Sequence, residues 1–213
     1  SLKNTISVNE DFGRLVGYYI SEGYAHYTNG VNKGIRFTFG SKEDIFIKDT
    51  VNLIERIFGF TPTVRENVDG SSNVDAWSQI MGEFFVSLIG TGFNKKRLNT
   101  LLLDASDEFL KGMLVGCFRG DGTVLDRSAE VSLSNPEIIS QLRTAALRIG
   151  LLPYERTFFS ASGSPTSTLK IPAISENNVD FIKYIDKNAD RFDGVLASDQ
   201  FRFARIIDGY VMY

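Results

Sequence analysis

The sequence has a single cysteine, Cys117, and a single histidine, His26, among its 213 residues. One cysteine cannot form a disulfide within the chain, and this fits a reducing compartment. Zinc sites need several cysteine or histidine ligands, so this metal chemistry is excluded. A catalytic triad would have to use His26 alone. If the protein is a hydrolase, carboxylates and lysines are therefore the residues left for its chemistry.

Long apolar runs are missing as well. No run reaches the ~18–20 residues that a membrane span needs, and the first residues lack the apolar stretch of a secretory signal. We therefore expect no membrane partner, no secretion, and an intracellular protein that is cytoplasmic or associated with the nucleoid. The net charge of −3 and the pI of about 5.3 argue against a surface covered in positive charge. They still allow a basic stripe on one face that binds nucleic acid.

An internal repeat organises the chain. Residues 15–23, LVGYYISEG, can be laid over residues 114–122, LVGCFRGDG, with a shift of 99 residues. Each copy is followed by two candidate strands (24–27 and 35–39; 123–127 and 130–133), a helix with one apolar stripe, two more strands (63–68 and 74–78; 154–159 and 166–171) and a third helix (82–89; 179–185). The predicted fold is therefore α+β, with two pseudo-symmetric α-β-β-α-β-β-α halves, residues 1–103 and 104–213. A tail helix is expected around residues 199–210.

The ends of the middle helices also recur. The first follows residues 41–44, which resemble a capping box, and the second follows Asn135, an N-cap residue before a proline. Both helices end at a glycine, Gly59 or Gly150, where a left-handed C-cap is easily formed. Chance similarity between two α+β stretches is the alternative interpretation, and the shared order of motif, cap, glycine and proline disfavours it.

Small residues recur every fourth position before each acid. They are Gly13, Gly17 and Ser21 in the first copy, and Gly112, Gly116 and Gly120 in the second. Positions four apart share one face of a helix, and a face of small residues allows two backbones to approach closely. We therefore expect the two helices to pack against each other through Gly13, Gly17, Gly112 and Gly116, about a pseudo-twofold axis.

The two acids, Glu22 and Asp121, lie at the C-terminal ends of these predicted helices. A carboxylate is disfavoured there by ~0.3–1 kcal/mol, because that end carries partial negative charge. Two such carboxylates brought together with free carbonyl groups make a site for a hard divalent cation, which prefers oxygen ligands. The alternative interpretation treats the glycines as packing residues and the acids as exposed helix ends. The same placement in both copies favours the functional interpretation.

The two nonamers resemble the motif of the LAGLIDADG homing endonucleases. The residues around the motifs look most like those of archaeal-type intron or intein endonucleases. The resemblance covers nearly the whole chain and implies a monomer. Each half would contribute a curved four-stranded antiparallel sheet, and the two sheets would form a saddle over double-stranded DNA with a long target site. The resemblance implies Mg²⁺ at Glu22 and Asp121, with Ser21 and Gly120 beside them, Mn²⁺ as a substitute, and Ca²⁺ supporting binding without cleavage. Each half would cut one strand across the minor groove, leaving short 3′ overhangs.

Supporting residues follow from the same resemblance. A lysine near each site is expected after the third helix: Lys95 or Lys96 in the first half, and Lys187, with Arg191 nearby, in the second. Lys95 and Lys96 also fit a solvated basic turn at a helix end. The resemblance also implies a polar residue near the metal-bound water at the end of each second strand, where Ser41 and Asn135 lie. Both are equally well explained as helix N-caps. The DNA-facing residues are expected on alternate strand positions and adjoining turns: Arg36, Thr38, Lys42, Arg65, Asn67, Arg127, Ser132, Ser134, Arg156 and Lys170.

Two other classes of function remain. The first is a non-cleaving nucleic-acid binder on the same scaffold, either an RNA maturase that assists intron splicing or a transcription factor. Retention of both Glu22 and Asp121 favours the endonuclease over this class. The second is an unrelated α+β enzyme with an acidic metal site, which the matched pair of acids and the absence of a Walker-type phosphate loop disfavour.

Overall fold

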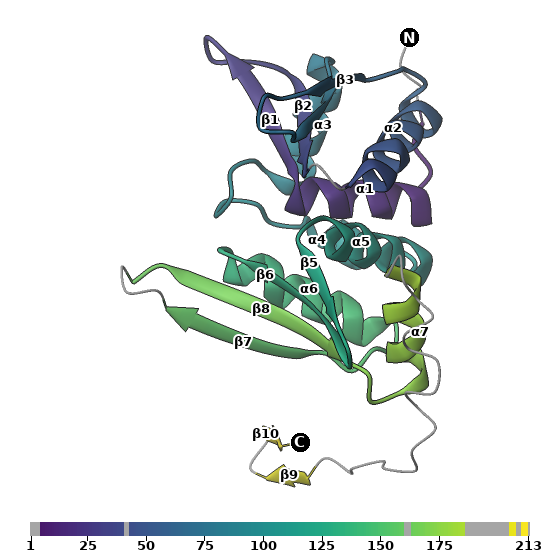
Figure 1. Cartoon of the computed structure of the whole chain (residues 1–213), viewed down its shortest axis with the longest axis vertical. Helices are drawn as coiled ribbons and strands as arrows, with labels where there is room; N and C mark the ends of the chain where they lie inside the picture. Colours follow the sequence, from purple (N-terminus) through teal and green to yellow (C-terminus); the bar gives the residue numbers. More distant parts are fainter. Residues whose placement is uncertain (1–4, 41–42, 160–162, 186–204, 208–209, 213) are drawn as a thin grey trace.

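The computed structural model describes residues 5–40, 43–159, 163–185, 205–207 and 210–212 (Figure 1). The first part of the chain forms α1 (Glu10–Ser21), β1 (Gly23–Thr28), β2 (Val31–Phe39), α2 (Asp44–Phe58), β3 (Thr63–Glu66), β4 (Ser72–Ala76) and α3 (Gln79–Ile89). After a short helix that the sequence did not predict, α4 (Thr100–Leu103), the same order returns as α5 (Asp107–Gly120), β5 (Gly122–Leu125), β6 (Ser128–Leu133), α6 (Pro136–Arg148), β7 (Tyr154–Phe159), β8 (Pro165–Pro172) and α7 (Glu176–Ile185). The expected α+β fold with two α-β-β-α-β-β-α halves is confirmed.

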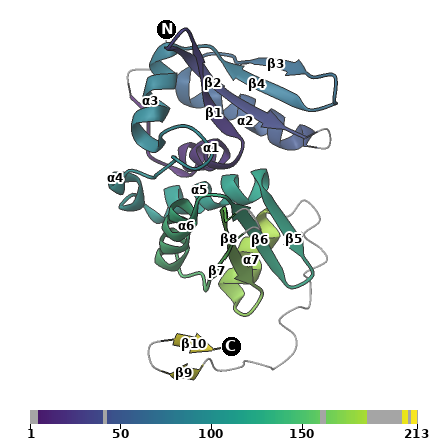
Figure 2. The ribbon, with the colours of Figure 1, turned by 90° about the vertical axis from the view of Figure 1, so that its left-hand side faces the viewer.

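Each half contains a four-stranded antiparallel sheet. The strand orders are β1-β2-β4-β3 and β5-β6-β8-β7, so the two sheets have the same topology. Figure 2 shows one sheet on each side of the central helices. In the first sheet Arg36 pairs with Asp75, and in the second Glu130 pairs with Lys170. These two cross-strand pairs occupy equivalent places in the two halves.

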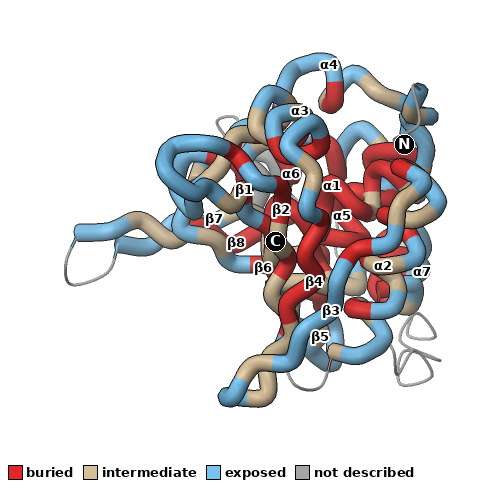
Figure 3. Tube along the Cα trace, turned by 90° about the horizontal axis from the view of Figure 1, so that it is seen from above, coloured by how far each residue is buried: buried red, intermediate tan, exposed pale blue. Residues whose placement is uncertain are grey.

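Helices α1 and α5 run side by side through the centre of the molecule, where Figure 3 shows most of the buried backbone. They contact each other through backbone, because a Cβ added to Gly17 would lie 2.1 Å from the carbonyl oxygen of Met113. A Cβ on Gly116 would lie 2.1 Å from the carbonyl oxygen of Arg14, and Gly13 and Gly112 face backbone oxygens at the same distance. We call these four glycines the glycine seam. The contacts pair early residues of α1 with early residues of α5, so the helices are parallel and their C-terminal ends meet.

The tail differs from the expectation. Strand β9 (Arg205–Ile207) pairs in antiparallel fashion with β10 (Tyr210–Met212). The helix expected around residues 199–210 is therefore wrong where the structure describes that range. The pattern there contains Ile206, Ile207 and Val211, and β-branched residues favour strands over helices. Among the described helices, none combines the length and apolar character that crossing a membrane would require.

Candidate functional site

Glu22 and Asp121 are the residues that cap the C-terminal ends of α1 and α5. The Glu22 N–H donates to the carbonyl of Tyr18 at 2.8 Å, and the Asp121 N–H donates to the carbonyl of Cys117 at 3.2 Å. The two ends touch: a Cβ added to Gly120 would lie 2.0 Å from Ser21 Oγ and 3.1 Å from Glu22 Cγ. The fold thus brings together the four residues that the sequence assigned to a metal site.

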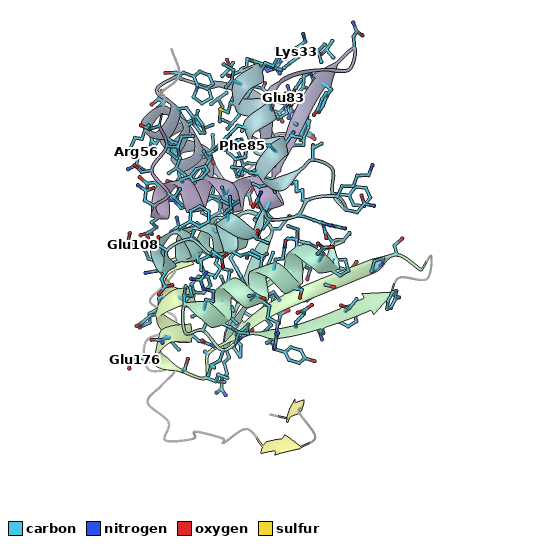
Figure 4. The ribbon with its side chains drawn as sticks, turned by 180° about the vertical axis from the view of Figure 1, so that it is seen from behind. Lys33, Arg56, Glu83, Phe85, Glu108 and Glu176 are labelled. Carbon is cyan, nitrogen blue, oxygen red and sulfur yellow. The ribbon has the colours of Figure 1, made fainter. Side chains whose placement is uncertain are left out.

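A cavity of about 470 Å³ opens at this end of the paired helices. Its lining comes from both halves and includes Ser21, Glu22, Thr38, Lys96, Asp121, Ser132, Ser134 and Asn135. Figure 4 shows Glu108, near the start of α5, on the same edge of the molecule as Arg56 and Glu176. The acid pair therefore lies at the opposite end of the paired helices from that charged edge.

Lys96 is the lysine that the structure places in this cavity, whereas Lys95 is exposed to solvent. The Lys96 side chain is buried, and its ammonium donates to three carbonyl oxygens at the end of α1 and the start of β1: Tyr19 at 2.6 Å, Ile20 at 2.8 Å and Gly23 at 2.6 Å. A lysine has three donors, so all of them are used. Lys96 therefore acts here as a buried cationic cap on α1, next to Glu22.

The environment of the acids opposes their negative charge. Burial, followed by repulsion from Asp121 and Glu43, raises the pKa of Glu22 to about 8. Burial also raises the pKa of Asp121, which is the more exposed of the two, while Lys96 opposes that shift. Burial lowers the pKa of Lys96 to about 8 against the pull of the nearby acids. An isolated pair of carboxylates is thus disfavoured here, and a cation between them would relieve the repulsion.

The donor set fits a hard divalent cation. It offers two carboxylates and the Ser21 hydroxyl, and such cations prefer oxygen ligands. Among the described residues, no three histidine, cysteine, aspartate or glutamate side chains gather in one cluster. A cation held here would therefore complete its coordination with water or with oxygens of a substrate, which is typical of Mg²⁺ bound to phosphates.

The pKa of Glu22 predicts a pH dependence of stability in metal-free protein. Between about pH 5 and pH 8 the folded protein keeps a proton on Glu22 that the unfolded chain releases, so the free energy of unfolding should fall as pH rises. Lys96, with a lowered pKa of about 8, would oppose this only at higher pH. Melting temperatures in EDTA should fall by several degrees over this range in the wild type and by less in Glu22→Gln. A melting temperature that stays level or rises would contradict the prediction.

Two residues at the site make contacts that the sequence does not predict: Glu43, expected only within a cap, and Asn135, expected as a helix N-cap or as a polar residue near the metal-bound water. Glu43 is the N-cap residue of α2 but makes no side-chain cap bond; its carboxylate accepts from the Gly40 N–H at 2.6 Å and raises the pKa of both acids. Asn135 caps α6 as expected and also donates to the carbonyl of Lys96 at 2.8 Å. The second half thereby holds the backbone of the lysine that caps α1. Neither contact has a signal in the sequence.

The residues expected to face DNA lie mostly on the sheet faces opposite the helices. Arg36 and Thr38 are on β2, Arg65 is on β3, and Ser132, Arg156 and Lys170 are on β6, β7 and β8. Asn67 follows β3, where its amide donates to Ser71 Oγ at 2.9 Å, and Arg127 is exposed in the turn between β5 and β6. Ser134 follows β6 and lines the cavity at the acids instead of the sheet. Lys42, Lys187, Ser41 and Arg191 lie outside the described residues.

These features define a class of protein: an α+β chain of two pseudo-symmetric halves joined by parallel glycine-packed helices, with an acid at the end of each. A mesophilic variant of the homing endonuclease I-DmoI has a similar structure, with a TM-score of 0.63 over 84% of this chain and 91% of that chain at 12% identity. Full-length DUF199/WhiA from Thermotoga maritima matches 90% of this chain and 61% of its own, with a TM-score of 0.58 at 14% identity. The chain is a LAGLIDADG-fold protein.

Curated proteins also match in sequence. An uncharacterized protein of Methanocaldococcus jannaschii is 32% identical over 157 residues, which are 69% of this chain and 18% of that protein. A DNA polymerase of Thermococcus aggregans is 31% identical over 126 residues, which are 57% of this chain and 6% of the polymerase. The chain thus spans less than a fifth of the length of these relatives. No protein-family model matches the chain.

Proposed function

We propose that this chain is a site-specific, metal-dependent DNA endonuclease that hydrolyses one phosphodiester in each strand of a duplex. The observation that carries the proposal is the meeting of Glu22 and Asp121 in an open cavity between the two sheets. The fold of I-DmoI supports it, since that endonuclease has been crystallised in complex with DNA and Mn. A DNA substrate also accounts for Arg36, Arg65, Arg156 and Lys170 on the sheet faces.

In this proposal Glu22 and Asp121 hold Mg²⁺, or Mn²⁺ in its place, beside the scissile phosphates, with Ser21 and Gly120 at the helix ends. The bound ion would polarise the phosphate and lower the pKa of water. The chain's own residues position the site. Lys96 fixes the end of α1 through three hydrogen bonds, and Asn135, from the other half, donates to the backbone carbonyl of Lys96. Residues 1–103 and 104–213 would each serve one strand, and the cuts across the minor groove would leave short 3′ overhangs.

The relatives support a mobile module. The matched segments fall in proteins with unrelated names: a DNA polymerase, an RNA polymerase subunit and iron–sulfur cluster assembly proteins. They cover only 6% to 17% of those proteins. A short segment shared by proteins of such different activities does not account for any one of those activities. We propose that the segment is an endonuclease module of the intron or intein kind, acting inside the cell as a monomer.

A non-cleaving nucleic-acid binder, such as a maturase or transcription factor, is the second candidate. DUF199/WhiA shares the fold over 90% of this chain, so the fold by itself does not establish cleavage. The acid pair favours the endonuclease, because two neighbouring carboxylates whose charges repel each other are costly to keep in a protein that only binds DNA.

The test is selection of cut sites from a library of random duplexes, followed by cleavage of a plasmid that carries the selected site. With Mg²⁺ we expect one enriched sequence, cut in both strands; with Ca²⁺ we expect binding to the same sequence without cutting. Binding should also weaken steeply as salt rises, because lysines and arginines would contact phosphates. A protein that binds the library and cuts no sequence with Mg²⁺ or Mn²⁺ would be the non-cleaving candidate.

A further inference from the structure

Asp75 on β4 lies beneath two arginines on the exposed face of the first sheet. Its carboxylate accepts from Nε and Nη2 of Arg36, the Nη2 contact at 3.1 Å, and from Nε and Nη2 of Arg65 at 3.1 and 2.6 Å. The Asp75 side chain is 0% exposed, whereas that of Arg36 is 16% exposed and that of Arg65 is 53% exposed. One buried carboxylate therefore holds two arginines, and Arg65 is the one that reaches solvent.

The two arginines differ in which of their hydrogen-bond donors remain available to a ligand. Arg36 also donates from Nη1 to the Tyr24 hydroxyl at 3.3 Å and lies 5.8 Å from the ring of Trp77. Arg65 gives only one side of its guanidinium, Nε and Nη2, to Asp75, and its Nη1 makes no hydrogen bond to any residue that the structure describes. The outer edge of Arg65 consists of Nη1 and the second N–H of Nη2. These two donors lie in one plane and are fixed in direction, so they match the O6 and N7 acceptors of guanine in the major groove.

The equivalent place in the second half carries the opposite arrangement of charge. There the acid Glu130 is on β6 and the cation Lys170 is on β8, with the ammonium 2.7 Å from the Glu130 carboxylate. Arg156 pairs with Thr168 as Arg65 pairs with Asn73, so the two arginines occupy equivalent positions. The Arg156 guanidinium, however, lies 4.4 Å from the centre of the Phe158 ring and not against a carboxylate. The cluster of two arginines on one aspartate is therefore a feature of the first half.

We propose that Arg65 is a specificity-determining residue that reads a guanine in one half of the DNA target, and that Asp75 is the positioning residue that fixes its direction. This proposal rests on the proposed DNA binding and adds a base and a position to it. Without the carboxylate, Arg65 would remain a flexible cation that binds phosphates as readily as bases. The negative charge of Asp75 therefore weakens the non-specific attraction of this face for DNA. The same carboxylate fixes the direction of Arg65, and this fixed direction allows discrimination between bases.

The experiment selects bound sequences from a random duplex pool in Ca²⁺ with four full-length proteins: wild type, Arg65→Lys, Asp75→Asn and Glu130→Gln. Arg65→Lys keeps the charge and loses the planar pair of donors, and because the side chain is half exposed the fold should tolerate it. Asp75→Asn keeps the shape and removes the charge that orients Arg65. Glu130→Gln makes the matched change at the equivalent place in the second half. Circular dichroism confirms that each variant is folded.

We expect the wild type to enrich a site with a guanine at one position in one half. Preference for that guanine should fall roughly tenfold in both Arg65→Lys and Asp75→Asn, and Asp75→Asn should bind unselected duplex at low salt at least as tightly as the wild type. Glu130→Gln should keep that guanine and alter only positions in the other half. A wild-type site that Arg65→Lys leaves unchanged would overturn this inference alone. If the wild type enriched no sequence, the proposed function would fail with it.

Discussion

Replacement of Glu22 by glutamine and Asp121 by asparagine in one chain is expected to lower double-strand cleavage by roughly a hundredfold or more. The two carboxylates are the charged ligands for the proposed cation, and metal-ion stabilisation of a transition state amounts to several kcal/mol, each ~1.4 kcal/mol being about tenfold in rate. The measurement is conversion of supercoiled plasmid carrying the selected site to nicked and linear forms. Each single variant should give nicked plasmid at most, because each half is proposed to serve one strand and only one half would retain its acid.

The same substitutions should not harm the fold, and this separates loss of chemistry from loss of structure. Burial and repulsion raise the pKa of Glu22 to about 8, so a neutral glutamine relieves a strain that the metal-free protein carries at neutral pH and above. Glu22→Gln should therefore melt at a higher temperature than the wild type in EDTA, while it binds the selected duplex with similar affinity. Glu83→Gln, on the exposed side of α3, is the matched control and should leave both cleavage and melting unchanged. Linearisation at the wild-type rate by the double variant would refute the site.

The central features of this site were predictable because they are local in sequence. Gly13 and Gly17 define one helix face by their spacing, and the acid that ends the helix follows at a fixed offset in both copies. The order of strands and helices followed from alternation, caps and glycines in the same way. Periodicity determines which face of an element is apolar, and this information is enough to place Glu22 and Asp121 at one end of a shared interface.

The remainder depends on contacts between distant segments. The sequence narrowed the first lysine to Lys95 or Lys96 but could not choose, because the turn after α3 decides which of two neighbours enters the cavity. Asp75 has its role only through the register that sets β4 between β2 and β3, with Arg36 on one side and Arg65 on the other. Glu43 lay within a predicted cap, and its effect on the acids arises because the end of β2 lies beside the cavity. Pairing register and turn geometry are not encoded in short-range periodicity.

Gly116→Ala tests the glycine seam, and two physical effects predict opposite signs for it. Alanine is favoured over glycine inside a helix by ~1 kcal/mol, so helix propensity alone predicts a more stable protein. The added Cβ would lie 2.1 Å from the carbonyl oxygen of Arg14 and 2.9 Å from the Tyr18 nitrogen, both of them backbone atoms of α1. Helix backbones cannot yield as a flexible side chain can, so the clash should outweigh propensity and lower the free energy of unfolding by about 3 kcal/mol.

Urea unfolding measures the change, and Gly40→Ala provides the control. Gly40 follows β2, and among the residues that the structure describes a Cβ there would meet the Glu43 carboxylate alone, at 3.4 Å. That variant should stay close to the wild type. Separation of α1 and α5 would also move Glu22 away from Asp121, so Gly116→Ala should lose cleavage at temperatures where it is still folded. If Gly116→Ala had the same free energy of unfolding as the wild type, the gain in helix propensity would offset the clash. Backbone contact at the glycine seam would then not hold the two halves together.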